Sequence, residues 1–153
     1  MVLECSYYEN DLHKSKRRFE QVTWDSSEFK KIHMHYDPTE ALGRIDNDTD
    51  LLAMLITVFI KECPTYTGKL QAACDSQDLN ALGDAAHNVK GASAAIGLED
   101  CRALAETLEV TCRQSGVTSI SHFENNTKRL IEMLNACEAP LSAWAKKNRA
   151  GAR

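Results

Sequence analysis

The chain has 153 residues, which is the length of a single domain built around one buried core. Charged residues make up 26% of the sequence, hydrophobic residues make up 43%, and the formal net charge is −4, so nothing in the composition indicates a nucleic-acid partner. The longest apolar run, 51–60, is too short to cross a bilayer, and residues 1–10 lack the apolar run of a secretory signal. We therefore expect a cytoplasmic protein.

The cysteine pattern does not indicate a disulfide framework or a metal site. Six cysteines are present but none forms a C-x-x-C pair, and Cys101 and Cys112 fall on the apolar side of a predicted helix. We expect reduced thiols within the core.

The first 37 residues mix aromatic and polar side chains without a sustained period. We predict an N-terminal extension, residues 1–37, of short helices or irregular structure. The basic cluster 14–18 is typical of a solvated face and less often of a docking patch for an acidic partner. His33 and His35 would lie on one side of a strand, but no cysteine or carboxylate cluster accompanies them, so we predict no metal site.

Two helices are expected next. Asp37 and Pro38 are typical of a helix start and predict a short helix over 38–45. Over 49–75 the apolar residues of the first half lie on nearly every side, which predicts a helix surrounded by other helices. Pro64 lacks an amide hydrogen and should kink or restart this helix.

The stretch 78–97 predicts one long helix, because helix-forming residues fill it, Asp78 is a typical N-cap and Gly97 is a typical left-handed C-terminal stop. At about 100° per residue, five apolar residues share the face that should meet the core. They are Leu82, Ala85, Val89, Ala92 and Ile96. On the same wheel His87 projects away from this face, toward solvent.

Two further helices complete the pattern. Apolar residues at helical spacing predict a helix over 98–113 and another over 120–144, which Pro140 should end or bend. No stretch alternates as a strand would. We predict an all-α fold, an up-down antiparallel four-helix bundle over 38–145, with the N-terminal segments as an addition and a basic, frayed tail at 146–153.

Two of the helix positions nearest to His87 have no side chain. Gly83 and Gly91 lie one turn before and after it, and Lys90 lies three residues on. A glycine inside a helix costs about 1 kcal/mol relative to alanine, so two of them beside one exposed ring indicate that a second molecule approaches the backbone there.

Five residues fit the spacing H-x-x-K-G-x-S-x-x-x-G. They are His87, Lys90, Gly91, Ser93 and Gly97. Through this motif the chain resembles histidine-containing phosphotransfer (HPt) domains of two-component phosphorelays, over roughly residues 38–137. The next predicted helix is also similar to the helix that follows in that family. The similarity lies in Leu104, Leu108, Glu109 and Cys112.

The resemblance implies a phosphocarrier. His87 would accept a phosphoryl group from the receiver-domain aspartate of a hybrid sensor kinase and pass it to the receiver aspartate of a response regulator. A neutral imidazole suits this task because it keeps a nucleophilic lone pair near neutral pH. Lys90 would neutralise charge on the phosphoryl group. The family has no ATP site or cofactor of its own, and the partner receiver brings the Mg²⁺.

The remaining motif residues receive supporting roles. Ser93 lies nearer the core and is expected to brace the helix through a hydrogen bond, and Gly97 is expected to be a structural stop. We expect the partner to dock on the residues around His87. They are Gly83, Asp84, Asn88, Gly91, Ala94 and Ala95.

Sequence motifs also limit the alternatives. No G-x-x-x-x-G-K-[ST] or G-x-G-x-x-G motif is present, so self-phosphorylation from ATP is not expected. One alternative stays open, a phosphate-independent module that sequesters a receiver through the same helix face. We expect a monomer, since a bundle of this length can bury its own core.

Overall fold

The computed structural model describes residues 34, 36–114 and 116–149, which fall within one compact unit, His33–Arg153. The predictions for most of the N-terminal extension, including the basic cluster 14–18 and the pair His33 and His35, lie outside the described residues.

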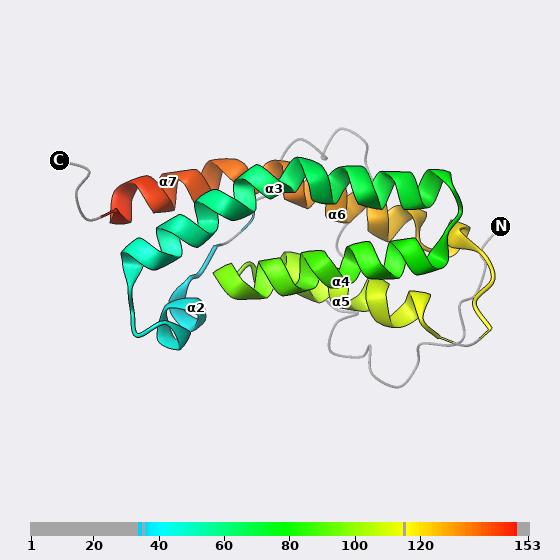
Figure 1. The fold of residues 1–153 in the computed structure, drawn as a ribbon, viewed down its shortest axis with the longest axis horizontal. Coiled ribbons are helices and arrows are strands. Elements are labelled where there is room, and N and C mark those ends of the chain that lie inside the picture. The colour runs from blue at the N-terminus through cyan, green and yellow to red at the C-terminus, as the bar shows by residue number, and fades with distance from the viewer. Residues whose placement is uncertain (1–33, 35, 115, 150–153) are drawn as a thin grey trace. The chain divides into compact units, whose positions relative to one another are not determined.

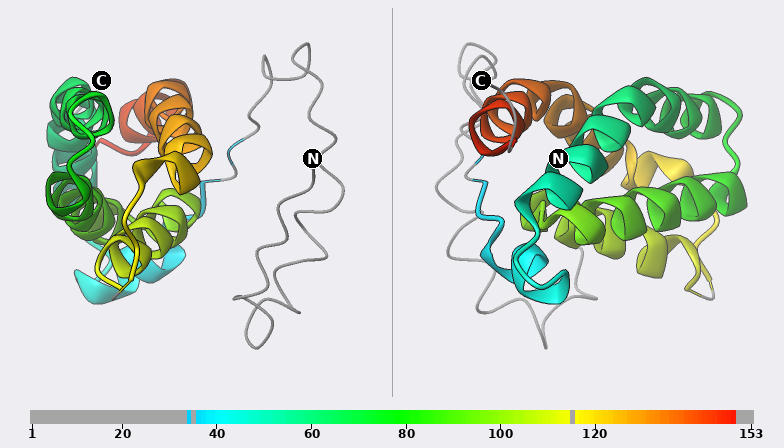
Figure 2. Two further views of the ribbon diagram at one scale, coloured as in Figure 1. Left: turned by 90° about the vertical axis from the view of Figure 1, so that its right-hand side faces the viewer. Right: turned by 60° about the vertical axis from the view of Figure 1, so that its left-hand side comes forward.

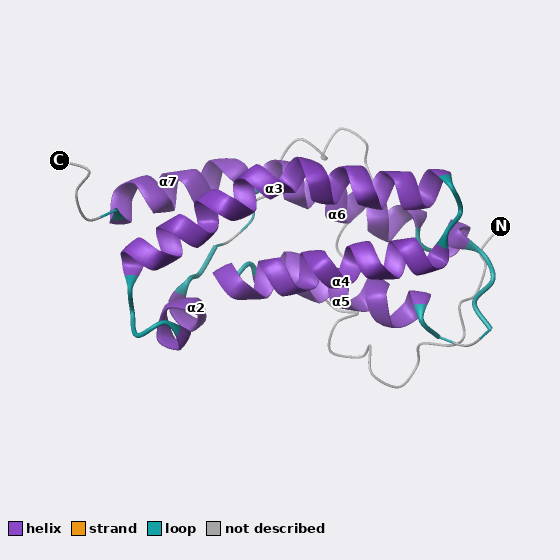
Figure 3. Ribbon diagram, in the orientation of Figure 1, coloured by secondary structure: helices purple, strands orange, loops and turns teal. Residues whose placement is uncertain are grey.

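The described residues are helical and contain no strand (Figures 1 and 3). The elements in chain order are α2 (Thr39–Arg44), α3 (Thr49–Asp75), α4 (Leu79–Ile96), α5 (Glu99–Cys112), the 3₁₀ turn η2 (Ile120–His122), α6 (Glu124–Ala136) and α7 (Glu138–Asn148). Within this part of the chain, no helix is both long enough and apolar enough to span a bilayer.

Four columns of helix form a bundle, seen end-on in the left view of Figure 2. α4 packs between α3 and α5, and the long α3 packs against both α6 and α7. The core between the columns is made mainly of aliphatic side chains, several of them at most 1% exposed. Among these are Leu52, Leu70, Leu82, Leu108, Leu130 and Leu134. The predicted all-α four-helix bundle is confirmed.

The helix α3 differs from the prediction in one respect. It is not surrounded on all sides, because Leu51, Met54 and Val58 are exposed, Met54 to 60%. Of the kink or restart predicted at Pro64, the restart does not occur, since α3 continues through this residue. A helix at the corner of a bundle has one outer face, and in the first half of α3 apolar residues occupy part of that face.

The ends of α4 are those predicted. The Asp78 carboxylate accepts a hydrogen bond from the Ala81 amide at 3.0 Å, and Gly97 has a left-handed φ of 77°. After this turn the Leu98 amide bonds to the Ser93 carbonyl at 2.9 Å. A Cβ atom on residue 97 would lie 3.1 Å from the Ala41 Cβ, so glycine also allows the close approach of α2.

The last predicted helix is divided into α6 and α7. The division falls at Cys137, which ends α6 and precedes α7. Pro140 is the third residue of α7, where a helix amide has no partner within the helix, so its missing hydrogen costs no helix bond. Pro140 therefore permits a new helix start here. α7 runs to Asn148, three residues beyond the predicted bundle boundary at 145, which itself stays a prediction.

Candidate functional site

His87 lies near the middle of α4 with 57% of its side chain exposed. Its exposure follows from the helix phase, because Leu82, Val89 and Ile96 on the opposite face are buried. The ring is thus held at the surface by a helix whose other side is fixed in the core.

One ring nitrogen of His87 has a defined partner on the neighbouring helix. Its Nδ1 lies 2.8 Å from Oε1 of Glu109 on α5. An ionised carboxylate only accepts hydrogen bonds, so in the neutral ring Nδ1 carries the hydrogen and Nε2 keeps the lone pair. In the neutral ring this contact therefore leaves Nε2 as the nitrogen with a free lone pair.

The same carboxylate binds the lysine of the motif. Lys90 Nζ lies 2.6 Å from Oε2 of Glu109, whose side chain is only 8% exposed. A buried carboxylate stays ionised only with partners, and the hydrogen bonds from Lys90 and then His87 hold the pKa of Glu109 below its usual range. Glu109 thus fixes both functional side chains relative to each other.

A second cation reaches the site from α5. The Arg113 guanidinium lies 3.5 Å from Oε1 of Glu109 and 3.3 Å from Oδ1 of Asp84, which is on α4 one turn before His87. Both Arg113 and Asp84 are largely exposed, so this bridge is weak and exchangeable. The Glu109 carboxylate that binds His87 is thus also contacted by two cations, Lys90 and Arg113.

The open position expected for Gly83 is wrong. Gly83 is buried, and a Cβ atom there would lie 3.4 Å from the Cys112 Cβ and 3.7 Å from the Arg113 Nε. The helix wheel placed Gly83 away from the core, but α5 covers that flank of α4. The Arg113 side chain lies against this position and reaches Asp84.

The other expected docking positions are more open. Asp84, Asn88, Gly91 and Ala95 are exposed, and a Cβ atom on residue 91 would meet nothing within 4 Å. Ala94 is half-buried.

The end of this surface lies against α2. The Arg44 guanidinium of α2 donates a hydrogen bond to the Ala94 carbonyl at 2.6 Å. The surface around His87 thus ends at Arg44.

The hydrogen bond expected from Ser93 is absent among the described residues. The Ser93 hydroxyl is fully buried and has no partner there. The backbone of Ser93, in contrast, does brace the helix end, since its carbonyl accepts from the Leu98 amide.

Glu109 and Arg113 are the two site residues to which sequence reasoning gave no role. Glu109 follows Leu108 at the edge of the apolar stripe of α5, where a buried charge needs a partner. An acidic residue beside the apolar stripe of a helix was therefore the sequence signal that could have identified Glu109. Among the described residues no group of three potential metal ligands is present.

Comparisons with known proteins bear on the family and the fold of the chain. The sequence profile described as "Hpt domain" matches residues 54–139, which is more than half of the chain and includes His87 and Glu109. No curated protein matches. A crystal structure of the HPT domain from the Hpt sensor hybrid histidine kinase of Shewanella is similar, with a TM-score of 0.66 and 18% sequence identity. The match covers 74% of this chain and 96% of that one, and it supports the fold.

Proposed function

The chain belongs to the Hpt domain family, whose members mediate phosphotransfer in two-component phosphorelays, and we propose that His87 is its phosphoacceptor. The observation that carries this proposal is the exposed imidazole of His87, bound through Nδ1 to the buried carboxylate of Glu109. Nε2 is left as the atom that a visiting phosphoryl group would meet.

Acceptance of the phosphoryl group needs a nucleophile and room for an in-line approach. The lone pair of Nε2 attacks the phosphorus of an aspartyl phosphate, the new N–P bond forms, and the P–O bond to the donor carboxylate breaks. The open surface at Gly91 gives a receiver domain access to the ring. The phosphorylated ring is cationic, and its Nδ1–H remains bonded to Glu109, which stabilises that charge.

Release reverses these steps toward a second aspartate. The cationic ring is a good leaving group, and its electron pair returns to Nε2 when the N–P bond breaks. Lys90 is bound to Glu109 next to the ring, and it can instead bind the phosphoryl oxygens. There it would stabilise their negative charge both when the group is accepted and when it is released. Lys90 is thus proposed as the electrostatic residue of the site.

The family also guides what we propose about the partners, the Mg²⁺ and the compartment. Hpt domains act as phosphocarriers with receiver domains as partners. We propose that the donor is the receiver of a hybrid sensor kinase, that the acceptor is a response regulator, and that each receiver supplies the Mg²⁺. We further propose a cytosolic monomer without an ATP site, and the free thiols of the described cysteines are compatible with that compartment.

The test is transfer from purified receiver domains. A panel of receivers is phosphorylated with labelled acetyl phosphate, each is incubated with the protein, and label on the protein is measured. We expect label that survives base and is lost in acid, as for phosphohistidine. His87→Gln should abolish it, and His122→Gln, a histidine outside the motif, should keep it.

Binding measurements separate the sequestering alternative from phosphotransfer. If the protein only binds a receiver, no receiver in the panel labels it, affinity survives His87→Gln, and Gly91→Glu removes it by blocking the open surface. Label retained by His87→Gln would reject His87 as the acceptor.

A further inference from the structure

Two cysteines from distant parts of the chain meet on the side of the bundle formed by α3, α6 and α7. The Sγ atoms of Cys63 on α3 and Cys137 at the α6–α7 junction lie 4.0 Å apart. Both residues are buried, and both thiols are free. A disulfide has its sulfurs about 2.05 Å apart, so the two atoms need to approach by only about 2 Å.

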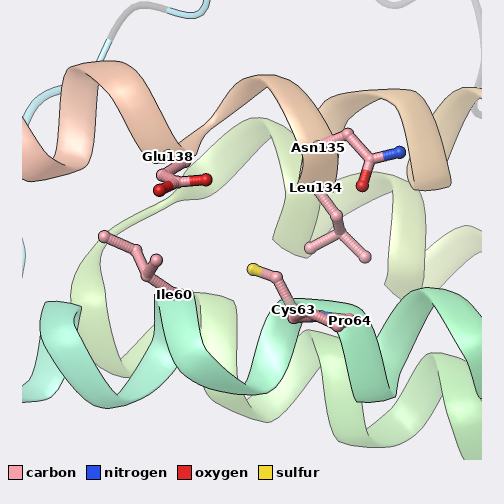
Figure 4. Close-up of a pocket in the computed structure, with 6 residues that line it drawn as sticks. All are labelled: Ile60, Cys63, Pro64, Leu134, Asn135 and Glu138. Atoms are coloured by element: carbon pink, nitrogen blue, oxygen red, sulfur yellow. The ribbon is translucent and has the colours of Figure 1, made fainter.

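A solvent-connected cleft leads to the first of these sulfurs. The cleft has a volume of about 90 Å³, enough for a molecule the size of hydrogen peroxide. In Figure 4 the Cys63 side chain points from α3 into this cleft, toward the facing α6–α7 segment. The lining residues are Ile60, Cys63, Pro64, Leu134, Asn135 and Glu138.

The two thiols receive separate roles because Cys63 lines the cleft and Cys137 does not, and the directions of their pKa shifts agree with this. The hydrogen bond with Cys137 lowers the pKa of Cys63, and the same contact, together with burial, raises the pKa of Cys137. The thiolate is the form that attacks an oxidant, so the cysteine that lines the cleft is also the one more readily ionised.

We infer that Cys63 and Cys137 form a peroxide-sensitive modification site that closes into a disulfide between α3 and the α6–α7 junction. The Cys63 thiolate attacks one oxygen of hydrogen peroxide, the O–O bond breaks, and the departing hydroxide takes up a proton to leave as water. Cys63 becomes a sulfenic acid. The Cys137 sulfur then attacks the Cys63 sulfur, the S–O bond breaks, and the hydroxide leaves as water with the Cys137 proton. Two thiols are oxidised by two electrons in total, and one peroxide is reduced to two waters.

The backbone on both sides favours this closure. Pro64 has no amide hydrogen, so the Ile60 carbonyl lacks its usual helix bond next to Cys63. Cys137 occupies the break between two helices rather than a helix interior. The missing helix bond next to Cys63 and the helix junction at Cys137 are thus the points where these two segments depart from a regular helix.

The experiment uses the full chain, reduced and then freed of reductant. The protein is treated with hydrogen peroxide, the remaining thiols are alkylated, and the products are analysed by mass spectrometry without reduction. We expect an intact mass lower by two hydrogens before alkylation, two of the six thiols protected, and one linked peptide pair that contains Cys63 and Cys137. Dithiothreitol should restore both thiols.

Variants test the order of the two steps. Cys137→Ala should leave the Cys63 sulfenic acid trapped by dimedone, whereas Cys63→Ala should leave Cys137 unlabelled by dimedone. Cys101→Ala, a buried cysteine of α5, is the matched control and should keep the linked peptide. The inference is overturned if both thiols stay free to alkylate in the wild-type protein, or if the links join other cysteines or two chains. The linked peptides found in the wild-type protein test the inference even if a variant does not fold.

Discussion

The Nδ1 atom of His87 lies 2.8 Å from Oε1 of Glu109, although 22 residues separate them in sequence. The other oxygen of the same carboxylate lies 2.6 Å from Lys90 Nζ. One buried acid on α5 thus contacts both the ring and the lysine, and we propose that Glu109 is a positioning residue of the site.

Glu109→Gln should slow phosphotransfer without abolishing it. The amide oxygen can still accept from His87 Nδ1, but the negative charge that stabilises the cationic ring is lost. A charge-assisted hydrogen bond exceeds a neutral one by about 1 kcal/mol, which corresponds to roughly fivefold in rate. Labelling by a phosphorylated receiver measures the rate.

Glu109→Ala should remove the orientation as well. Nitrogen NMR of the His87 ring should show an increased fraction of the tautomer with hydrogen on Nε2, while Glu109→Gln should resemble the wild type. An unchanged tautomer ratio in Glu109→Ala would show that Glu109 does not select the reactive nitrogen.

Stability should depend on pH through Glu109. Its pKa in the folded protein is lowered from 4.5, mainly by the hydrogen bond from Lys90, so the unfolded chain binds the proton more tightly. The resulting stabilisation is fully present above about pH 4.5 and is lost as pH falls through the folded-state value. Urea unfolding of wild type and Glu109→Gln from pH 7 to about pH 3 should therefore show a difference that shrinks below the unfolded pKa. A difference independent of pH would contradict this.

Alanine substitutions at Gly91 and Gly97 should change the free energy of unfolding in opposite directions. Gly91 lies in a helix with open space around it, so Gly91→Ala should raise the free energy of unfolding by about 0.5–1 kcal/mol. Gly97 has a φ of 77° and lies against Ala41, so Gly97→Ala should lower it by about 1–2 kcal/mol or more. Thermal and urea unfolding of both variants provide the measurement. Equal effects would mean that the two positions do not differ as described.

The outer face of α3 should contribute little to stability. Leu52→Ala removes a fully buried side chain and should cost about 2–5 kcal/mol. Met54→Ala, two residues along the same helix, removes an exposed side chain and should change the free energy of unfolding by less than about 0.5 kcal/mol. Urea denaturation of the pair checks this, and a large loss for Met54→Ala would mean that another part of the protein covers this face.

Features that depend on local sequence were predictable. The Asp78 cap, the Gly97 stop and the exposed position of His87 follow from spacing and helix phase within one segment. Gly83 was misplaced because a helix wheel shows the core side but not the neighbour that covers a flank. The role of Glu109 depends on how α5 is rotated against α4, which no single-helix pattern specifies.

The connection between α4 and α5 consists of Gly97 and Leu98. Because it is so short, the proposed acceptor ring, its carboxylate partner and both cations all come from residues 84–113. One helical hairpin therefore holds the candidate site together, and a displacement of α5 relative to α4 would separate the ring from its carboxylate partner.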